Sequence, residues 1–244
     1  MQYFWNTTQT IAPGLGFSRF GWIHLTWLSI LGMVWLGVCL AYRGLSKRWQ
    51  RRVLKGIACV MIAGEIFRMA VLFGTDQFHW KYLPLDLCGV SMVVCLMHAF
   101  RPNDDRAEFL YAVTRPLAIL ILLIPGWNEL PARNFFHIYG FVSHGLMGLY
   151  AMLVLNNGFQ ADYRRLGKVA ATLLCVAPPI YLMNRFGSVG FFFLLDASEV
   201  DVFRGVAEKI GEGWCIVLYM AGLLILWTLM YAPSRRRIAL EEQT

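Results

Sequence analysis

The sequence predicts an all-helical protein that crosses a membrane about seven times. Of its 244 residues, 58% are hydrophobic and 15% are charged, whereas soluble chains carry about 25% charged residues. Apolar runs of about 20 residues, which is the length that crosses about 30 Å of hydrocarbon, recur along the whole chain. The aromatic content of 15% fits the same fold, because Trp and Tyr gather at membrane interfaces. These features exclude a soluble domain, a disordered chain and a small disulfide framework.

Seven apolar runs define the predicted spans. They cover Trp22 to Tyr42, Val53 to Gly74, Leu83 to Phe100, Phe109 to Pro125, Phe135 to Asn156, Gly167 to Met183 and Gly213 to Ala232. No linker rich in Pro, Gly or Ser and no internal repeat divides the chain, so residues 1–244 are interpreted as one integral membrane domain. The longest connection, residues 184–212, mixes an apolar stretch with charged residues and is predicted to be an extracytoplasmic loop lying on the interface.

The basic residues predict the orientation of the spans. Six of them and no acidic residue separate the first two spans: Arg43, Lys47, Arg48, Arg51, Arg52 and Lys55. By the positive-inside rule this loop is cytoplasmic, which places the N-terminus outside and the C-terminus inside the cell membrane. The net charge of +7 is largely this topology signal, so a nucleic-acid partner is not predicted. No basic region precedes a short apolar stretch at the N-terminus, so no cleavable signal peptide is predicted.

The six cysteines do not indicate a disulfide framework or a metal site. All of them fall inside or at the edge of predicted spans, with no C-x-x-C pair and no histidine at metal-ligand spacing. Small, inert packing residues are the ordinary role of such cysteines. The sequence therefore predicts no metal and no other cofactor.

Ionisable residues at membrane depth are the informative ones, because they are costly and usually face a bundle interior or a wet cavity. Counting from the span ends places a polar group in the outer half of the bundle: His24, Glu65, Arg68, Asp86, Cys88, His137, His144 and Asn184. The inner half is nearly bare, with His98 and Arg115 as the main exceptions. This pattern predicts an outer-half cavity that binds a membrane lipid or an amphiphilic small molecule.

Four of these residues have a substrate-binding interpretation and an alternative structural one. Glu65 and Arg68 stand at i and i+3, so they either contact a ligand or form an ion pair that locks the second span to a neighbour. His24 and His137 lie at span ends, where histidines are more often interfacial anchors than ligands. Asn184, at the outer end of the sixth span, is also a candidate contact.

Three residues are candidates for chemistry. Cys88 lies near the start of a span, where a helix N-terminus favours a thiolate, and is the best nucleophile candidate among the cysteines. Asp86 precedes it and either assists a histidine or caps the helix. His144 lies two turns inside its span, where it needs a partner whether or not it is catalytic.

Several of these residues together resemble a known family. The resemblance rests on Leu83-Pro84-Leu-x-Leu-Cys88 at the start of one span, Ser143-His144-Gly145 in a later span, the acidic Glu65 in the span before Cys88, and an early His24. In these features the sequence resembles the YwaF family of bacterial integral membrane proteins. The resemblance covers most of the chain from His24 to the last span. That family also resembles a eukaryotic membrane acyltransferase of ether-phospholipid remodelling, whose suspected Cys and His fall on Cys88 and His144. Where the family commonly has His in its L-P-L-H-L-C motif, this chain has Asp86.

Two hypotheses of different classes follow. In the first, the protein is a lipid acyltransferase or hydrolase: Cys88 attacks an acyl ester, His144 is general base and then acid, Asp86 or Glu65 orients the imidazole, and Arg68 holds the lipid phosphate. In the second, the protein is a non-catalytic membrane binding or transport protein that uses the same cavity.

Overall fold

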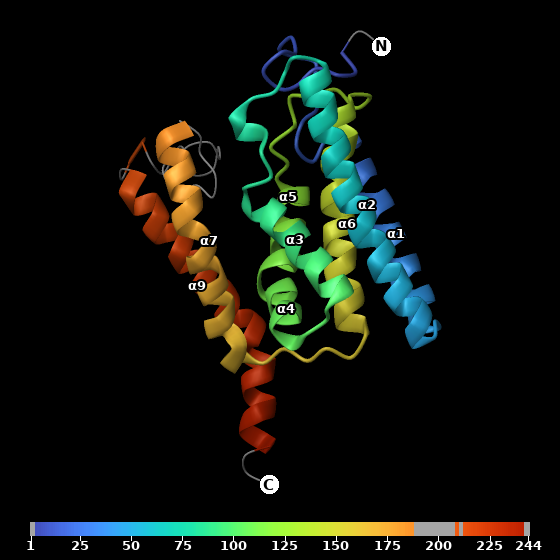
Figure 1. Ribbon diagram of the computed structural model, residues 1–244, viewed down its shortest axis with the longest axis vertical. Helices are drawn as coiled ribbons and strands as arrows, with labels where there is room; N and C mark the ends of the chain where they lie inside the picture. Colours follow the sequence, from blue (N-terminus) through green and yellow to red (C-terminus); the bar gives the residue numbers. More distant parts are fainter. Residues whose placement is uncertain (1–2, 188–207, 210–211, 242–244) are drawn as a thin grey trace. The chain divides into compact units, whose positions relative to one another are not determined.

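All regular secondary structure in the described part of the chain is helical (Figure 1). The structure is a computed structural model that describes residues 3–187, 208–209 and 212–241, and no strand occurs within those residues. The all-helical fold class is confirmed. The chain forms two compact units: residues 1–84 with 88–159, and residues 85–87 with 160–244. Each unit is described by itself, and the interpretation of residues 1–244 as one domain stays a prediction.

The first unit begins with two long helices joined by the short turn of residues 44–46. α1 (Trp22–Arg43) matches the predicted first span and ends at Gly44. α2 (Lys47–Gly74) starts six residues before the predicted second span, because its first two turns are built from Lys, Arg and Gln, which are good helix formers. The six basic residues predicted to lie in a loop are therefore helical: Arg43 ends α1, and the other five lie in the first three turns of α2.

The next two predicted spans are less regular than the sequence analysis expected. The third span was predicted from Leu83, but α3 (Leu87–Phe100) starts four residues later. A short 3₁₀ turn, η1 (Trp80–Tyr82), precedes it, and Leu83 is extended, with φ −61° and ψ 142°, as expected for a residue before proline. The 14 residues of α3 give a length of about 21 Å, which is shorter than the hydrocarbon core of about 30 Å.

The predicted fourth span is a composite helix. α4 (Asp104–Phe109) starts at the Asn103 cap, continues into the π-helical η2 (Leu110–Thr114), and then into α5 (Arg115–Leu123). Pro116 explains the widened turn, because a proline lacks the N–H that would bond the carbonyl four residues earlier, which lies inside η2. Because its first residue is Asp104, this composite helix begins five residues before the predicted span.

Helix α6 (Phe135–Asn156) has the predicted bounds and contacts α1, α2 and α5. Glycines on α6 accept large side chains from α1. A Cβ added at Gly145 would lie 2.7 Å from Leu31, and one at Gly148 would lie 2.5 Å from the Trp35 ring. Trp35 also donates from Nε1 to the Gly145 carbonyl oxygen at 2.9 Å. The absence of side chains at these two positions therefore lets α1 pack closely on α6.

The second unit contains η3 (Tyr163–Arg165), α7 (Leu166–Gly187) and α9 (Glu212–Glu241). The backbone N–H of Tyr163 donates to Ser234 Oγ at 3.3 Å, which ties η3 to α9. Both helices are longer than the predicted sixth and seventh spans. The predicted loop 184–212 falls largely outside the described residues, and its first residues belong to α7.

Five helical segments among the described residues are long and apolar enough to cross a membrane: Trp22–Arg43, Lys47–Gly74, Trp80–Phe100, Phe135–Asn156 and Tyr163–Arg185. Large apolar side chains are exposed along them; Met33 and Leu36 of α1 are 66% and 63% exposed. An aqueous environment disfavours such a surface, and a lipid environment suits it. The total of seven spans and their orientation stay predictions.

Candidate active site

The segment around Cys88 folds tightly at the start of α3. Cys88 lies in the first turn of α3 and is 7% exposed. A Cβ added at Gly89 would run into the backbone carbonyl of Pro84, so only glycine fits directly after the cysteine. Asp86 is exposed, just before the helix. The sequence analysis did not single out Gly89, although a glycine inside an apolar helix is a sequence signal of close backbone approach.

His144 of α6 is held in one orientation and one tautomer. Its Nδ1 lies 2.7 Å from the Gly140 carbonyl oxygen, which can only accept, so Nδ1 carries the proton in the neutral ring. Nε2 is then the basic nitrogen of that ring. The Trp127 indole stacks on the imidazole with centroids 5.2 Å apart and planes 18° apart. The ring is thereby fixed as a general base requires.

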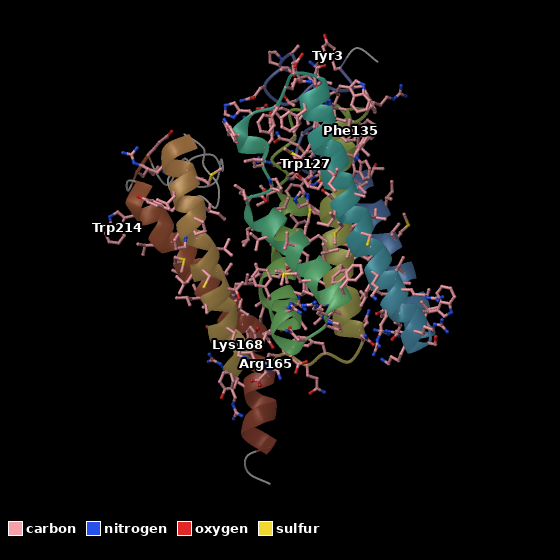
Figure 2. All side chains as sticks on the ribbon, in the orientation of Figure 1. Tyr3, Trp127, Phe135, Arg165, Lys168 and Trp214 are labelled. Carbon is pink, nitrogen blue, oxygen red and sulfur yellow. The ribbon has the colours of Figure 1, made fainter. Side chains whose placement is uncertain are left out.

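Trp127, labelled in Figure 2, lies in the loop between α5 and α6 and was not predicted as a site residue. A Cβ added at Gly140 would lie 2.6 Å from its indole, so this glycine provides the space in which Trp127 reaches His144. The Nε1–H of Trp127 is buried and has no acceptor among the described residues. A buried donor without a partner is uncommon in folded proteins, so this N–H is a feature that needs an explanation.

His24 and His137 share an aromatic cluster with the residues that surround His144. The His137 ring lies 4.8 Å from Phe17 and 5.1 Å from Phe141, and the His24 ring lies 5.8 Å from Phe141. Trp127 joins the same cluster, 5.3 Å from Phe141. The structure thus brings the three predicted histidines of the first unit to one cluster.

His24 and His137 make structural hydrogen bonds. His24 accepts the Phe20 N–H at Nδ1, at 2.9 Å, and therefore donates from Nε2 to the Leu122 carbonyl oxygen at 2.8 Å. Phe20 has a φ of 60°, which is unusual for a residue with a side chain, and the bond to His24 holds that turn. His137 donates from Nδ1 to the Leu130 carbonyl oxygen at 3.2 Å, while its Nε2 is buried without a partner among the described residues.

Glu65 and Arg68 form the ion pair that their spacing predicts. Arg68 Nε donates to Glu65 at 3.0 and 3.2 Å, and its Nη2 donates to Glu65 and, at 2.5 Å, to the Tyr82 carbonyl oxygen. Tyr139 of α6 donates its hydroxyl to the same carboxylate. The side chains of Arg68 and Glu65 are 13% and 12% exposed. The group therefore ties α2 to α6 and to the segment before α3.

Tyr139 was missed by the sequence analysis, which considered only ionisable and histidine side chains of that span. A signal was available, because a tyrosine hydroxyl inside a helix bundle usually needs a partner. A buried carboxylate in a neighbouring span is such a partner.

The remaining candidates lie elsewhere. Asn184 is buried on α7, in the second unit, and Asp86 is grouped with that unit. Cys88 and His144 belong to different helices, and their pairing stays a prediction. Within the described residues, no group of three or more His, Cys, Asp or Glu side chains is placed to hold a metal ion.

The fold and these segments define a multi-pass helical membrane protein. The model of the TMEM164 family matches residues 15–231, so the chain belongs to the TMEM164 family. Comparison with curated proteins and with solved structures finds no match.

Proposed function

We propose that this protein is a membrane enzyme that transfers or hydrolyses an acyl group of a lipid, with Cys88 as nucleophile and His144 as general base. The observation that carries the proposal is the tautomer of His144, whose Nδ1 is committed to the Gly140 carbonyl oxygen. This leaves the basic nitrogen at Nε2, as in other enzymes where a second group orients the catalytic imidazole. The resemblance of the Cys88 and His144 motifs to the YwaF family and to an ether-phospholipid acyltransferase supports the same assignment.

The reaction has two steps, the formation of a thioester on Cys88 and the transfer of its acyl group. Nε2 of His144 takes the proton of the Cys88 thiol while Sγ forms a bond to the acyl carbonyl carbon of a lipid ester. The carbon–oxygen ester bond then breaks, and the leaving alcohol takes the proton from the imidazolium, which gives a thioester on Cys88. In the second step His144 removes the proton of an acceptor hydroxyl or of water, the new acyl–oxygen bond forms, and Sγ leaves and is reprotonated.

Trp127 provides the donor that the tetrahedral intermediate needs. Its indole stacks on the His144 ring, and its Nε1–H has no acceptor among the described residues, so we assign this N–H to the acyl carbonyl oxygen. Removal of one such donor typically lowers the rate of acyl transfer by about a hundredfold or more. Trp127→Phe keeps the ring stacked on His144 but removes the N–H, so we expect a loss of that size.

The other predicted contacts take supporting roles in this proposal. Arg68 binds the phosphate of the lipid and Glu65 holds the guanidinium toward it, although each already has the other as a partner. His24 and His137 position the aromatic cluster through their backbone bonds. Asp86 keeps the orienting role and Asn184 the substrate contact that the sequence predicts, and the Gly140 carbonyl supplies the orienting contact to His144 that a carboxylate gives in other enzymes.

An acyl-labelling assay on the purified full-length protein tests the proposal. A lipid ester with a labelled acyl chain is incubated with wild type, Cys88→Ser, His144→Ala and the control Cys95→Ser, whose thiol is fully buried on the same helix. We expect no thioester label in Cys88→Ser, about a hundredfold slower labelling in His144→Ala, and normal labelling in Cys95→Ser. Equal labelling of Cys88 and Cys95, or full biological activity of Cys88→Ser, would favour the binding or transport alternative.

A further inference from the structure

A second polar site lies at the opposite end of the first unit from η1, where the α3–α4 loop and the end of α6 meet α2 (Figure 1). A pocket of about 440 Å³ opens there, within the range of about 300 to 1,000 Å³ typical of small-molecule sites. All of its lining residues belong to the first unit. The basic loops predict that this end of the bundle faces the cytoplasm.

Two cations of α2 face this pocket without a counterion. Arg51 and Lys55 line it and stand four residues apart, on one side of the helix. Within the part of the chain that the structure describes, neither side chain forms an ion pair, and the ammonium of Lys55 rests 5.0 Å from the centre of the Phe100 ring. Neighbouring Lys47 differs, because its ammonium donates to Asn157 at 2.6 Å.

His98 lines the same pocket. The side chain is 7% exposed, and its Nδ1 lies 2.9 Å from the Tyr150 hydroxyl. Nε2 has no hydrogen bond within the described residues and, unlike Nε2 of His137, is not a fully enclosed atom, so it is the ring nitrogen that can meet a ligand in the pocket. A histidine that is nine-tenths buried and uses only one nitrogen is costly unless the other meets a ligand or water.

We propose that this pocket binds the phosphate group of a phospholipid from the adjacent leaflet. Arg51 and Lys55 provide the charge, as basic residues next to membrane spans do for anionic headgroups, and His98 Nε2 donates to the phosphate while Nδ1 accepts the Tyr150 hydroxyl. Asp104 also lines the pocket and has an interaction of its own, and the two cations outnumber this one acid in the lining. The site is separate from the Cys88 and His144 region and does not depend on the proposed acyl chemistry.

The binding test uses the purified full-length protein and three probes: dioctanoyl phosphatidylglycerol, dioctanoyl phosphatidylcholine and inorganic phosphate. Bound lipid is counted by native mass spectrometry. The test variant is Arg51→Gln with Lys55→Gln. The control is Arg48→Gln with Arg52→Gln, which removes the same charge from the same helix at residues that do not line the pocket.

We expect phosphatidylglycerol to bind wild type more tightly than phosphatidylcholine does, and the test variant to weaken that binding by about tenfold or more. The control and Cys88→Ser should change it by less than about threefold. An equal loss in both double variants would overturn the proposal, because general surface charge would then explain the binding. Competition by inorganic phosphate as strong as that by the short-chain lipid would overturn the lipid assignment in favour of a soluble phosphate compound.

Discussion

The two ends of α2 carry the same residue type in opposite situations. Arg68 is largely buried and uses Nε and Nη2 for Glu65 and the Tyr82 carbonyl oxygen. Arg51, near the start of the helix, is exposed, faces a pocket and has no ion-pair partner among the described residues. A buried charge must be balanced inside the protein, whereas a charge at the membrane surface can stay available to a ligand. The Glu65 end of α2 therefore contributes mainly to the fold, and the Arg51 end mainly to binding.

The largest effect on stability is expected at Glu65. Glu65→Met removes the counterion of Arg68 and the acceptor of the Tyr139 hydroxyl, and should destabilise the protein by about 3 kcal/mol. Met at both Glu65 and Arg68 should lose less than Glu65→Met alone, because no unpaired charge is then left. Unfolding in detergent, compared for the single and double variants, measures both. A double variant less stable than the single one would show that the charges act independently of each other.

His24→Phe should have the next largest effect. The substitution keeps an aromatic ring in the cluster but leaves the Phe20 N–H and the Leu122 carbonyl oxygen without partners, at a cost of about 2 kcal/mol. Thermal unfolding measures the loss, and acyl labelling of the remaining folded protein should be nearly normal. Unchanged stability with lost labelling would instead support the substrate-binding role that the sequence predicts for His24.

A smaller loss is expected at Gly140. Gly140→Ala pushes the Trp127 indole away from α6, which should cost about 1 to 2 kcal/mol and slow acyl labelling, because His144 loses its stacked neighbour. Gly37→Ala is the matched control: nothing lies within 4 Å of an added Cβ there, so the gain in helix propensity should leave stability equal or slightly higher. Equal behaviour of the two variants would mean that the Trp127 contact is not tightly packed.

The smallest effect on stability is expected at the other end of α2. Arg51→Gln with Lys55→Gln removes two exposed cations that have no ion-pair partner within the described residues, so the midpoint of thermal unfolding without lipid should not move. Added phosphatidylglycerol should stabilise wild type and not this variant, since a ligand stabilises only the state it binds. A lower midpoint of thermal unfolding for this variant without lipid would contradict this expectation, because it would show that the two cations stabilise the fold as Arg68 does.

Structural features that depend on one dominant sequence property were predicted correctly. Long apolar runs predicted the bounds of α6 and the start of α1, and i, i+3 spacing predicted the Glu65–Arg68 pair. Hydropathy failed where proline and polar residues shape the helix. Hydropathy started the third span at Leu83, although α3 begins only after the turn at Pro84. It started the fourth span at Phe109 and so left out Glu108, which is fully buried in α4.

Partners across the bundle were the second kind of information that the sequence lacked. Tyr139 meets Glu65 across 74 residues, and Trp127 reaches His144 only because Gly140 has no side chain. Neither contact follows from spacing within one helix. The pocket at Arg51 was not predicted for a related reason. Arg51 and Lys55 were interpreted as a topology signal, and a topology signal gives no information on whether the two cations share a cavity with His98.

The central claim is that His144 acts as the base for Cys88, and the alkylation rate of Cys88 tests it most directly. Iodoacetamide is added to wild type and His144→Ala at neutral pH, and modification of Cys88 and Cys95 is followed by peptide mass spectrometry. We predict that Cys88 reacts faster than Cys95 in wild type and that the His144→Ala variant slows Cys88 by about tenfold or more, with Cys95 unchanged. Equal rates at Cys88 in the two proteins would contradict the claim.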